Sequence, residues 1–183
     1  MPIINLPIER IERREGGEGQ HYADDRKVNP EAATAIIETL RQQRLREADF
    51  FMDGVWRFAC YKESPFPNIA YGVPEHVAAE LSSEGAAQKA ADMPASQWCS
   101  VLRNALAHGG IAYLNAEGRS SYQESVKMYA FVSGKYDQSS EENPKTLIAV
   151  NFLRISEADY YDFLRRWVAW LQKTGIARAA EAA

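Results

Sequence analysis

The stretch Arg103-Asn104-Ala105-Leu106-Ala107-His108-Gly109-Gly110 closes a helical pattern around which the rest of the chain is organised. The apolar residues of this pattern recur at the i, i+3, i+4, i+7 and i+8 spacing of one buried helix face, namely Trp98, Val101, Leu102, Ala105 and Leu106. Pro94 suits a first helical turn, and Gly109 suits the left-handed residue that ends a helix. The stretch therefore predicts an amphipathic helix over residues 94–108.

The opposite side of this predicted helix is polar. At about 100° per residue, Arg103 and Asn104 fall about 140° and 120° around the helix from Trp98, and His108 falls about 80° from it. A cation, an amide and an imidazole are thus expected beside an abrupt helix end. Simpler explanations are that the partly negative carboxyl end of a helix favours a histidine there, and that the arginine is ordinary solvated surface.

Arg103, Asn104 and His108 resemble the signature of the HEPN family (higher eukaryotes and prokaryotes nucleotide-binding domains). That signature is Arg-x4–6-His near the end of a core helix, with a polar residue, often Asn, after the Arg. The specific match spans about ten residues, and a short motif is a hypothesis until its structural context agrees. The resemblance implies a helical domain that pairs as a homodimer, so that two copies of the motif face one cleft. Many members of the family are metal-independent endoribonucleases.

One position departs from a HEPN subgroup. HEPN toxins that pair with a nucleotidyltransferase antitoxin typically carry a Tyr two residues after the His. Here that position is Gly110, and the nearest tyrosine is Tyr113. This difference argues against that subgroup and its control by tyrosine modification.

The resemblance and the residue chemistry together favour a metal-independent endoribonuclease of a toxin or defence system. A histidine can take or give a proton near neutral pH, and one imidazole per chain cannot serve as base and acid at once, so a dimer makes chemical sense. Arg103 would hold the phosphate and stabilise its developing charge, and Asn104 would position Arg103 or the phosphate. The products would be a 2′,3′-cyclic phosphate and a 5′-OH.

No cofactor is expected, and the expected partners are RNA, a second copy of the chain and an antitoxin or regulatory protein. Two other functions stay open at this stage. One is a non-catalytic HEPN homodimer that binds RNA, a nucleotide or a protein partner. The other is a purely structural helical dimer in which Arg103 pairs with a carboxylate.

The fold class expected is mainly α (α+β). It combines a HEPN-like antiparallel helical bundle with a small antiparallel sheet of about three strands after the motif helix, where the apolar period changes from 3.6 to 2, and a C-terminal amphipathic helix. The predicted elements are helices over 29–62, 74–91, 94–108 and 156–174, and strands over 111–115, 126–133 and 146–154. An N-terminal arm (1–28) would precede a single domain (29–175), and a tail (176–183) would follow it.

The first predicted helix carries further candidates. Asp49, Asp53 and Arg57 are spaced i, i+4, i+8 and would form a surface ion-pair row, unless one of the acids orients His108 from this neighbouring helix. A second group of candidates consists of cations that would contact RNA or simply form a solvated helix face, namely Arg41, Arg44, Arg46 and Arg57.

Composition limits the function classes. The chain has 183 residues and a formal net charge of −4, which argues against a nonspecific nucleic-acid coat but leaves room for a local RNA cleft. Cys60 and Cys99 lie in apolar patterns and are expected to be reduced thiols in a cytoplasmic protein. Three scattered histidines and two cysteines give no metal-ligand spacing. No apolar run approaches the roughly 20 residues of a membrane span, and no signal peptide is recognised.

Overall fold

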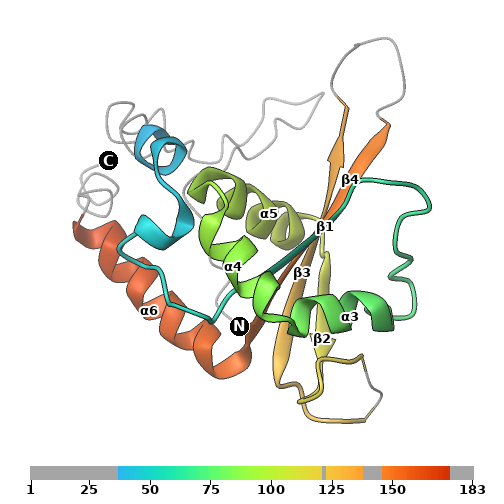
Figure 1. Cartoon of the computed structure of the whole chain (residues 1–183). Coiled ribbons are helices and arrows are strands. Elements are labelled where there is room, and N and C mark those ends of the chain that lie inside the picture. The colour runs from blue at the N-terminus through green and yellow to red at the C-terminus, as the bar shows by residue number, and fades with distance from the viewer. Residues whose placement is uncertain (1–36, 121–122, 138–145, 174–183) are drawn as a thin grey trace, which may run out of the picture.

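A four-stranded antiparallel sheet forms the centre of the computed structural model, which describes residues 37–120, 123–137 and 146–173 (Figure 1). The strand order is β1-β4-β3-β2. The strands are β1 (Arg57–Tyr61), β2 (Ile111–Leu114), β3 (Met128–Tyr136) and β4 (Leu147–Ser156). The helices are the 3-10 helix η1 (Leu45–Glu47), α3 (Glu75–Ser82), α4 (Glu84–Asp92), α5 (Ala95–Ala107) and α6 (Glu157–Lys173), and residues 37–42 are also helical.

The expected fold class is therefore wrong. The molecule is mixed α+β and built on a four-stranded sheet, whereas a mainly helical bundle with about three strands was expected. The additional strand is β1, which pairs with β4 at one edge of the sheet. Its residues lie within the helix predicted over 29–62.

The predicted helix over 29–62 ends at residue 42 in the described part of the chain. The large buried residues that follow are Leu45, Phe50 and Trp56, at intervals of five and six. Such intervals match no single helix face, because a helix brings residues three or four apart to the same side. Gly54 then takes a left-handed backbone conformation, with φ of +68°, and the chain enters β1. Other residues of this segment recur at intervals of three and four, and this spacing is the reason that the sequence predicted a helix.

The predicted helix over 74–91 is two helices. Ser83 interrupts it with extended backbone (φ −73°, ψ 153°), and its hydroxyl accepts a hydrogen bond from the Ala86 amide at 3.2 Å. A serine in this role is a typical N-cap, so α4 begins afresh after it.

The remaining predicted elements lie close to observed ones. Strands β2, β3 and β4 overlap the predicted ranges, although β3 extends to Tyr136 and β4 to Ser156. The Ser156 hydroxyl accepts a hydrogen bond from the Asp159 amide at 3.0 Å, so Ser156 caps α6, where the predicted helix also begins. The predicted arm (1–28) and tail (176–183) lie outside the described residues.

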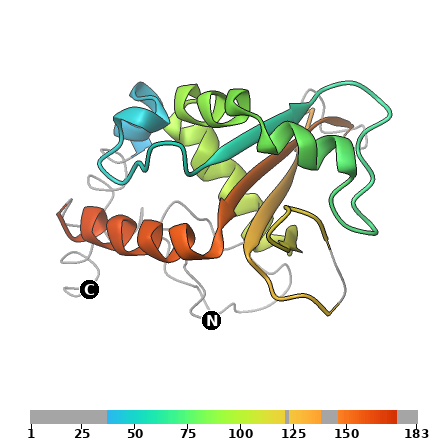
Figure 2. The ribbon, with the colours of Figure 1, turned by 60° about the horizontal axis from the view of Figure 1, so that its bottom comes forward.

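The two faces of the sheet bury different apolar clusters. Figures 1 and 2 show α3 and α6 on opposite sides of the sheet. One cluster joins Phe131 and Leu153 to side chains of α5 and α6, and the other joins Ala130 and Phe152 to side chains of α3. Alternate strand residues point to opposite faces, so both faces of the central strands are buried. The sheet thus separates the α5 surface from the α3 surface.

Candidate active site at the carboxyl end of helix α5

Helix α5 ends as the sequence predicts. Ala107 is its last residue, His108 is its C-cap, and Gly109 has a φ of +69°. The Gly110 amide then donates to the carbonyl of Ala105 at 2.8 Å, which completes the usual hydrogen-bond pattern of a glycine-terminated helix. Most of the predicted apolar face is buried, although Leu106 is only half-buried.

Gly110 has a packing reason of its own. The Val132 amide donates to the Gly110 carbonyl at 2.7 Å, which holds the end of α5 against β3. A β-carbon at position 110 would collide with the carbonyl oxygen of Val132. Both glycines after His108 are therefore explained by the fold, and neither is evidence of chemistry.

Arg103, Asn104 and His108 are not among the buried residues of α5. Arg103 Nη1 donates to Asn104 Oδ1 at 2.7 Å, and both side chains are half-buried. His108 is exposed, and its ring makes no hydrogen bond or ion pair within residues 37–120, 123–137 and 146–173. The last turn of α5 thus presents an arginine steadied by its neighbouring amide and a histidine open to solvent.

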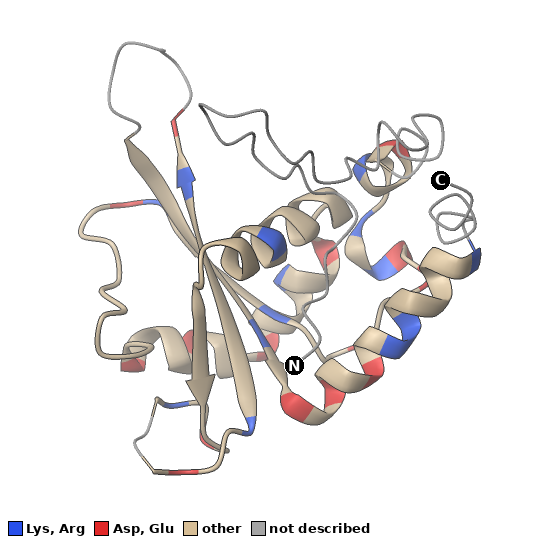
Figure 3. Cartoon of the chain, turned by 180° about the vertical axis from the view of Figure 1, so that it is seen from behind, with Lys and Arg blue, Asp and Glu red and all other residues tan. Residues whose placement is uncertain are grey.

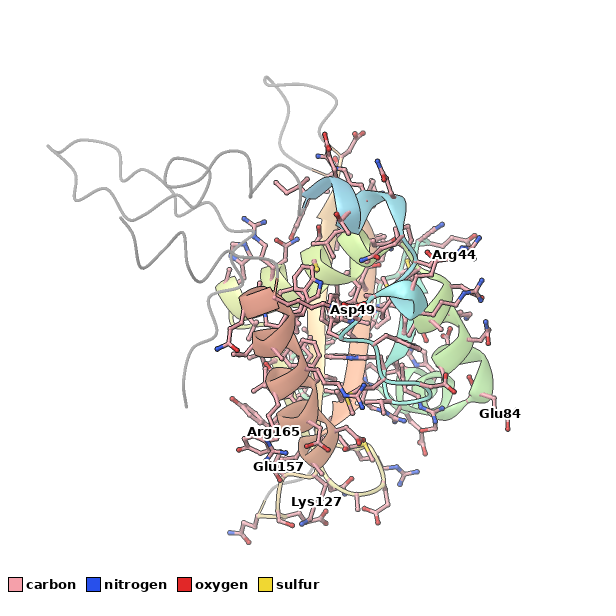
Figure 4. The ribbon with its side chains drawn as sticks, turned by 90° about the vertical axis from the view of Figure 1, so that its left-hand side faces the viewer. Arg44, Asp49, Glu84, Lys127, Glu157 and Arg165 are labelled. Atoms are coloured by element: carbon pink, nitrogen blue, oxygen red, sulfur yellow. The ribbon has the colours of Figure 1, made fainter. Side chains whose placement is uncertain are left out.

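The structure does not bring Asp49 or Asp53 to His108 within one chain. Both lie in the connection before β1 and not on a neighbouring helix, and Figure 4 labels Asp49 there. Asp49 Oδ2 accepts a hydrogen bond from Lys173 Nζ of α6 at 2.9 Å. Phe50 packs on Trp98, with 5.6 Å between the ring centroids. Trp98 precedes His108 by about 15 Å of helix, so this connection lies at the far end of α5. The orienting contact considered from the sequence is absent in the single chain.

The four candidate RNA-contacting arginines do not form one cluster. Arg44 and Arg46 share the Asp92 carboxylate, at 3.4 and 2.6 Å. Arg44 also forms a backbone bridge with Pro94, at the amino end of α5, which is about 20 Å of helix from His108. Arg57 lies on β1, and Arg41 is an exposed residue of the helical segment 37–42.

Sequence reasoning missed Arg154, the one cation of the described chain whose residue is buried. It lies on β4, where Nη2 donates to the Leu81 carbonyl at 2.9 Å and Nη1 to Ser82 Oγ at 3.0 Å. The available signal was strand alternation. Arg154 lies two residues after the apolar Phe152 and so points to the same face of the strand.

The cysteines and the other side chains able to bind a metal add no further candidate site among the described residues. Cys60 and Cys99 are free thiols, and burial raises the pKa of both. Among the described residues, no three His, Cys, Asp or Glu side chains come together as a metal site would require. None of the described helices is long and apolar enough to span a bilayer.

Comparison with known proteins finds no significant match to this chain among protein-family models, curated proteins or solved structures.

Proposed function

We propose that the chain is a metal-independent endoribonuclease whose chemistry is carried by His108, Arg103 and Asn104. The observation that carries this proposal is the composition of the α5 end: an exposed imidazole follows an arginine that a neighbouring amide holds at 2.7 Å. None of the three is among the buried residues of α5. The likeness to the HEPN motif supports the same assignment, although the helical bundle that it implied is not the fold of this chain.

The proposed reaction uses the RNA's own 2′-OH as nucleophile. One imidazole removes the proton of that hydroxyl, and a second protonates the departing 5′ oxygen. Each chain contributes one His108, so the two imidazoles come from the two copies of a homodimer. The Arg103 guanidinium stabilises the charge that develops on the phosphate, and Asn104 fixes the position of Arg103. The products are a 2′,3′-cyclic phosphate and a 5′-OH.

In this proposal the enzyme is cytoplasmic, belongs to a toxin or defence system and is restrained by an antitoxin or regulatory protein. The alternative is a homodimer that binds RNA, a nucleotide or a protein partner without cleaving it. The distance of Asp49 from His108 favours this alternative, because no described carboxylate of the same chain orients the imidazole. A purely structural role for His108 is disfavoured by its exposure.

RNA digestion in the presence of a metal chelator tests the proposal. We expect single-stranded RNA to be cleaved in chelator as fast as in magnesium buffer, because imidazoles perform both proton transfers. Gel electrophoresis of end-labelled RNA measures the rate. Cleavage that depends on added magnesium contradicts the imidazole mechanism, and RNA that is bound but left intact supports the non-catalytic alternative.

A further inference from the structure

Two arginines face each other across the edge of the sheet. Arg57 of β1 and Arg154 of β4 are directly paired in the antiparallel register, and Figure 3 shows basic segments on these neighbouring strands. Side chains at such paired positions lie about 5 Å apart at their β-carbons, and like charges there repel each other. The pair is therefore costly unless something with negative charge lies against it.

Both guanidinium groups bind the turn between α3 and α4. Arg57 Nη1 donates to the Ser83 carbonyl at 2.7 Å, and Arg154 donates to Leu81 and Ser82 as described above. All these acceptors are neutral. The carboxyl end of a helix supplies only about half a negative charge, which leaves most of the charge of two guanidinium groups uncompensated.

Neither arginine forms an ion pair with any carboxylate in the described part of the chain. Arg154 is nevertheless only 7% exposed, and charged residues are rarely so buried without a counter-charge. Burial and, to a lesser degree, the charge of Arg57 lower the pKa of Arg154. A bound anion would oppose this lowering of the Arg154 pKa, because negative charge nearby favours the protonated guanidinium.

The two guanidinium groups also keep unused hydrogen-bond donors. Each guanidinium group has five N–H groups. Arg154 donates through Nη1 and Nη2, one hydrogen bond each, and Arg57 donates through Nη1 alone. A β-carbon at Gly118 would lie 2.7 Å from Nη1 of Arg154. Glycine there, with a φ of +75°, lets the turn before β3 approach the guanidinium closely.

We propose that Arg57 and Arg154 form a binding site for a phosphate group, either as inorganic phosphate or as a phosphomonoester such as a nucleoside monophosphate. A phosphomonoester carries about two negative charges and oxygens that suit the forked donors of two guanidinium groups. The site lies on the α3 face of the sheet, whereas His108 follows α5 on the other face. It is thus separate from the proposed active site and does not depend on the proposed function.

Isothermal titration calorimetry and thermal unfolding with inorganic phosphate, AMP and acetate, at constant ionic strength, test this proposal. We expect phosphate and AMP to bind the parent and to raise Tm by about 5–10 °C at a hundredfold excess over Kd, while acetate binds far more weakly. Tighter binding of AMP than of phosphate would identify a nucleotide as the better ligand. The absence of phosphate binding, or equal binding of acetate, would overturn the proposal.

Two variants of Arg57 and one control locate the site. Arg57→Met is expected to weaken phosphate binding about 10- to 100-fold, because it removes charge-assisted hydrogen bonds. Arg57→Lys keeps the charge but loses the forked N–H donors of the guanidinium group, so it is expected to weaken phosphate binding at least about tenfold. This variant replaces Arg57→Met in the test if the methionine variant does not fold. Arg165→Met, on α6 beside Asp162, makes the same change of charge and should bind as the parent does. Parent-like binding by folded Arg57 variants would overturn the site.

Discussion

Replacing His108 by alanine is expected to lower the rate of RNA cleavage about 10²- to 10⁴-fold while leaving Tm unchanged. The large effect on rate follows because the imidazole is a proton-transfer group of the proposed reaction. The small effect on stability follows because the side chain is exposed and makes no hydrogen bond among the described residues. Cleavage assays and thermal unfolding of the same preparation measure both quantities.

Two further α5 variants sharpen this experiment. Arg103→Ala should also abolish cleavage, because it removes the group that stabilises the phosphate charge. Ser100→Ala, at an exposed position of the same helix, should cleave RNA like the parent. Parent-like cleavage by His108→Ala would refute the enzyme proposal in favour of the binding alternative. A large fall in Tm for that variant would indicate a structural histidine.

The largest expected loss of stability comes from Trp98→Ala. Trp98 is fully buried and contacts Phe50, Trp56, Phe163 and Trp167, with ring centroids 5.0–6.1 Å apart. Removing a buried tryptophan costs about 3–5 kcal/mol, which corresponds to roughly 6–20 °C in Tm for a chain of this size. Chemical and thermal unfolding measure the change.

Gln97→Ala is the matched control for Trp98→Ala. It truncates the adjacent, exposed residue of the same helix and should change stability by less than about 0.5 kcal/mol. If Trp98→Ala had the same Tm as the control, the packing of the segment 48–56 against α5 would be contradicted. That packing replaces the long helix expected there, so the pair of variants also tests the corrected fold.

The parts of the fold that the sequence predicted are those whose signal is local. Helix α5 combines an apolar face with Pro94 before it and Gly109 after it, and its observed bounds agree with those signals. The α6 residues Phe163, Trp167 and Trp170 are likewise buried, as the predicted amphipathic helix over 156–174 requires.

The segment before β1 was not predictable in the same way. Its large buried residues are placed by tertiary contacts, such as Phe50 against the α6 ring of Trp167 at 4.7 Å. The strand β1 depends on pairing with β4, which lies about ninety residues later in the sequence. Neither contact leaves a periodic signal within the segment, so propensity and spacing suggested a helix.

The candidate site was predictable only in part. The sequence suggested that Asn104 would position Arg103, and the two side chains do form a hydrogen bond at 2.7 Å. The distance between Asp49 and His108 could not be foreseen from the sequence, because it depends on which end of α5 is covered by the connection before β1. The facing of Arg57 and Arg154 similarly required the register of β1 against β4.

In the proposed reaction, His108 drives attack by the RNA's own 2′-OH. The most direct test is the identity of the ends produced when the parent protein digests RNA in chelator, determined by mass spectrometry with His108→Ala as the control. We expect a 2′,3′-cyclic phosphate and a 5′-OH, which should be absent from the control digest. A 5′-phosphate and a 3′-OH, or the same products from His108→Ala, would contradict it.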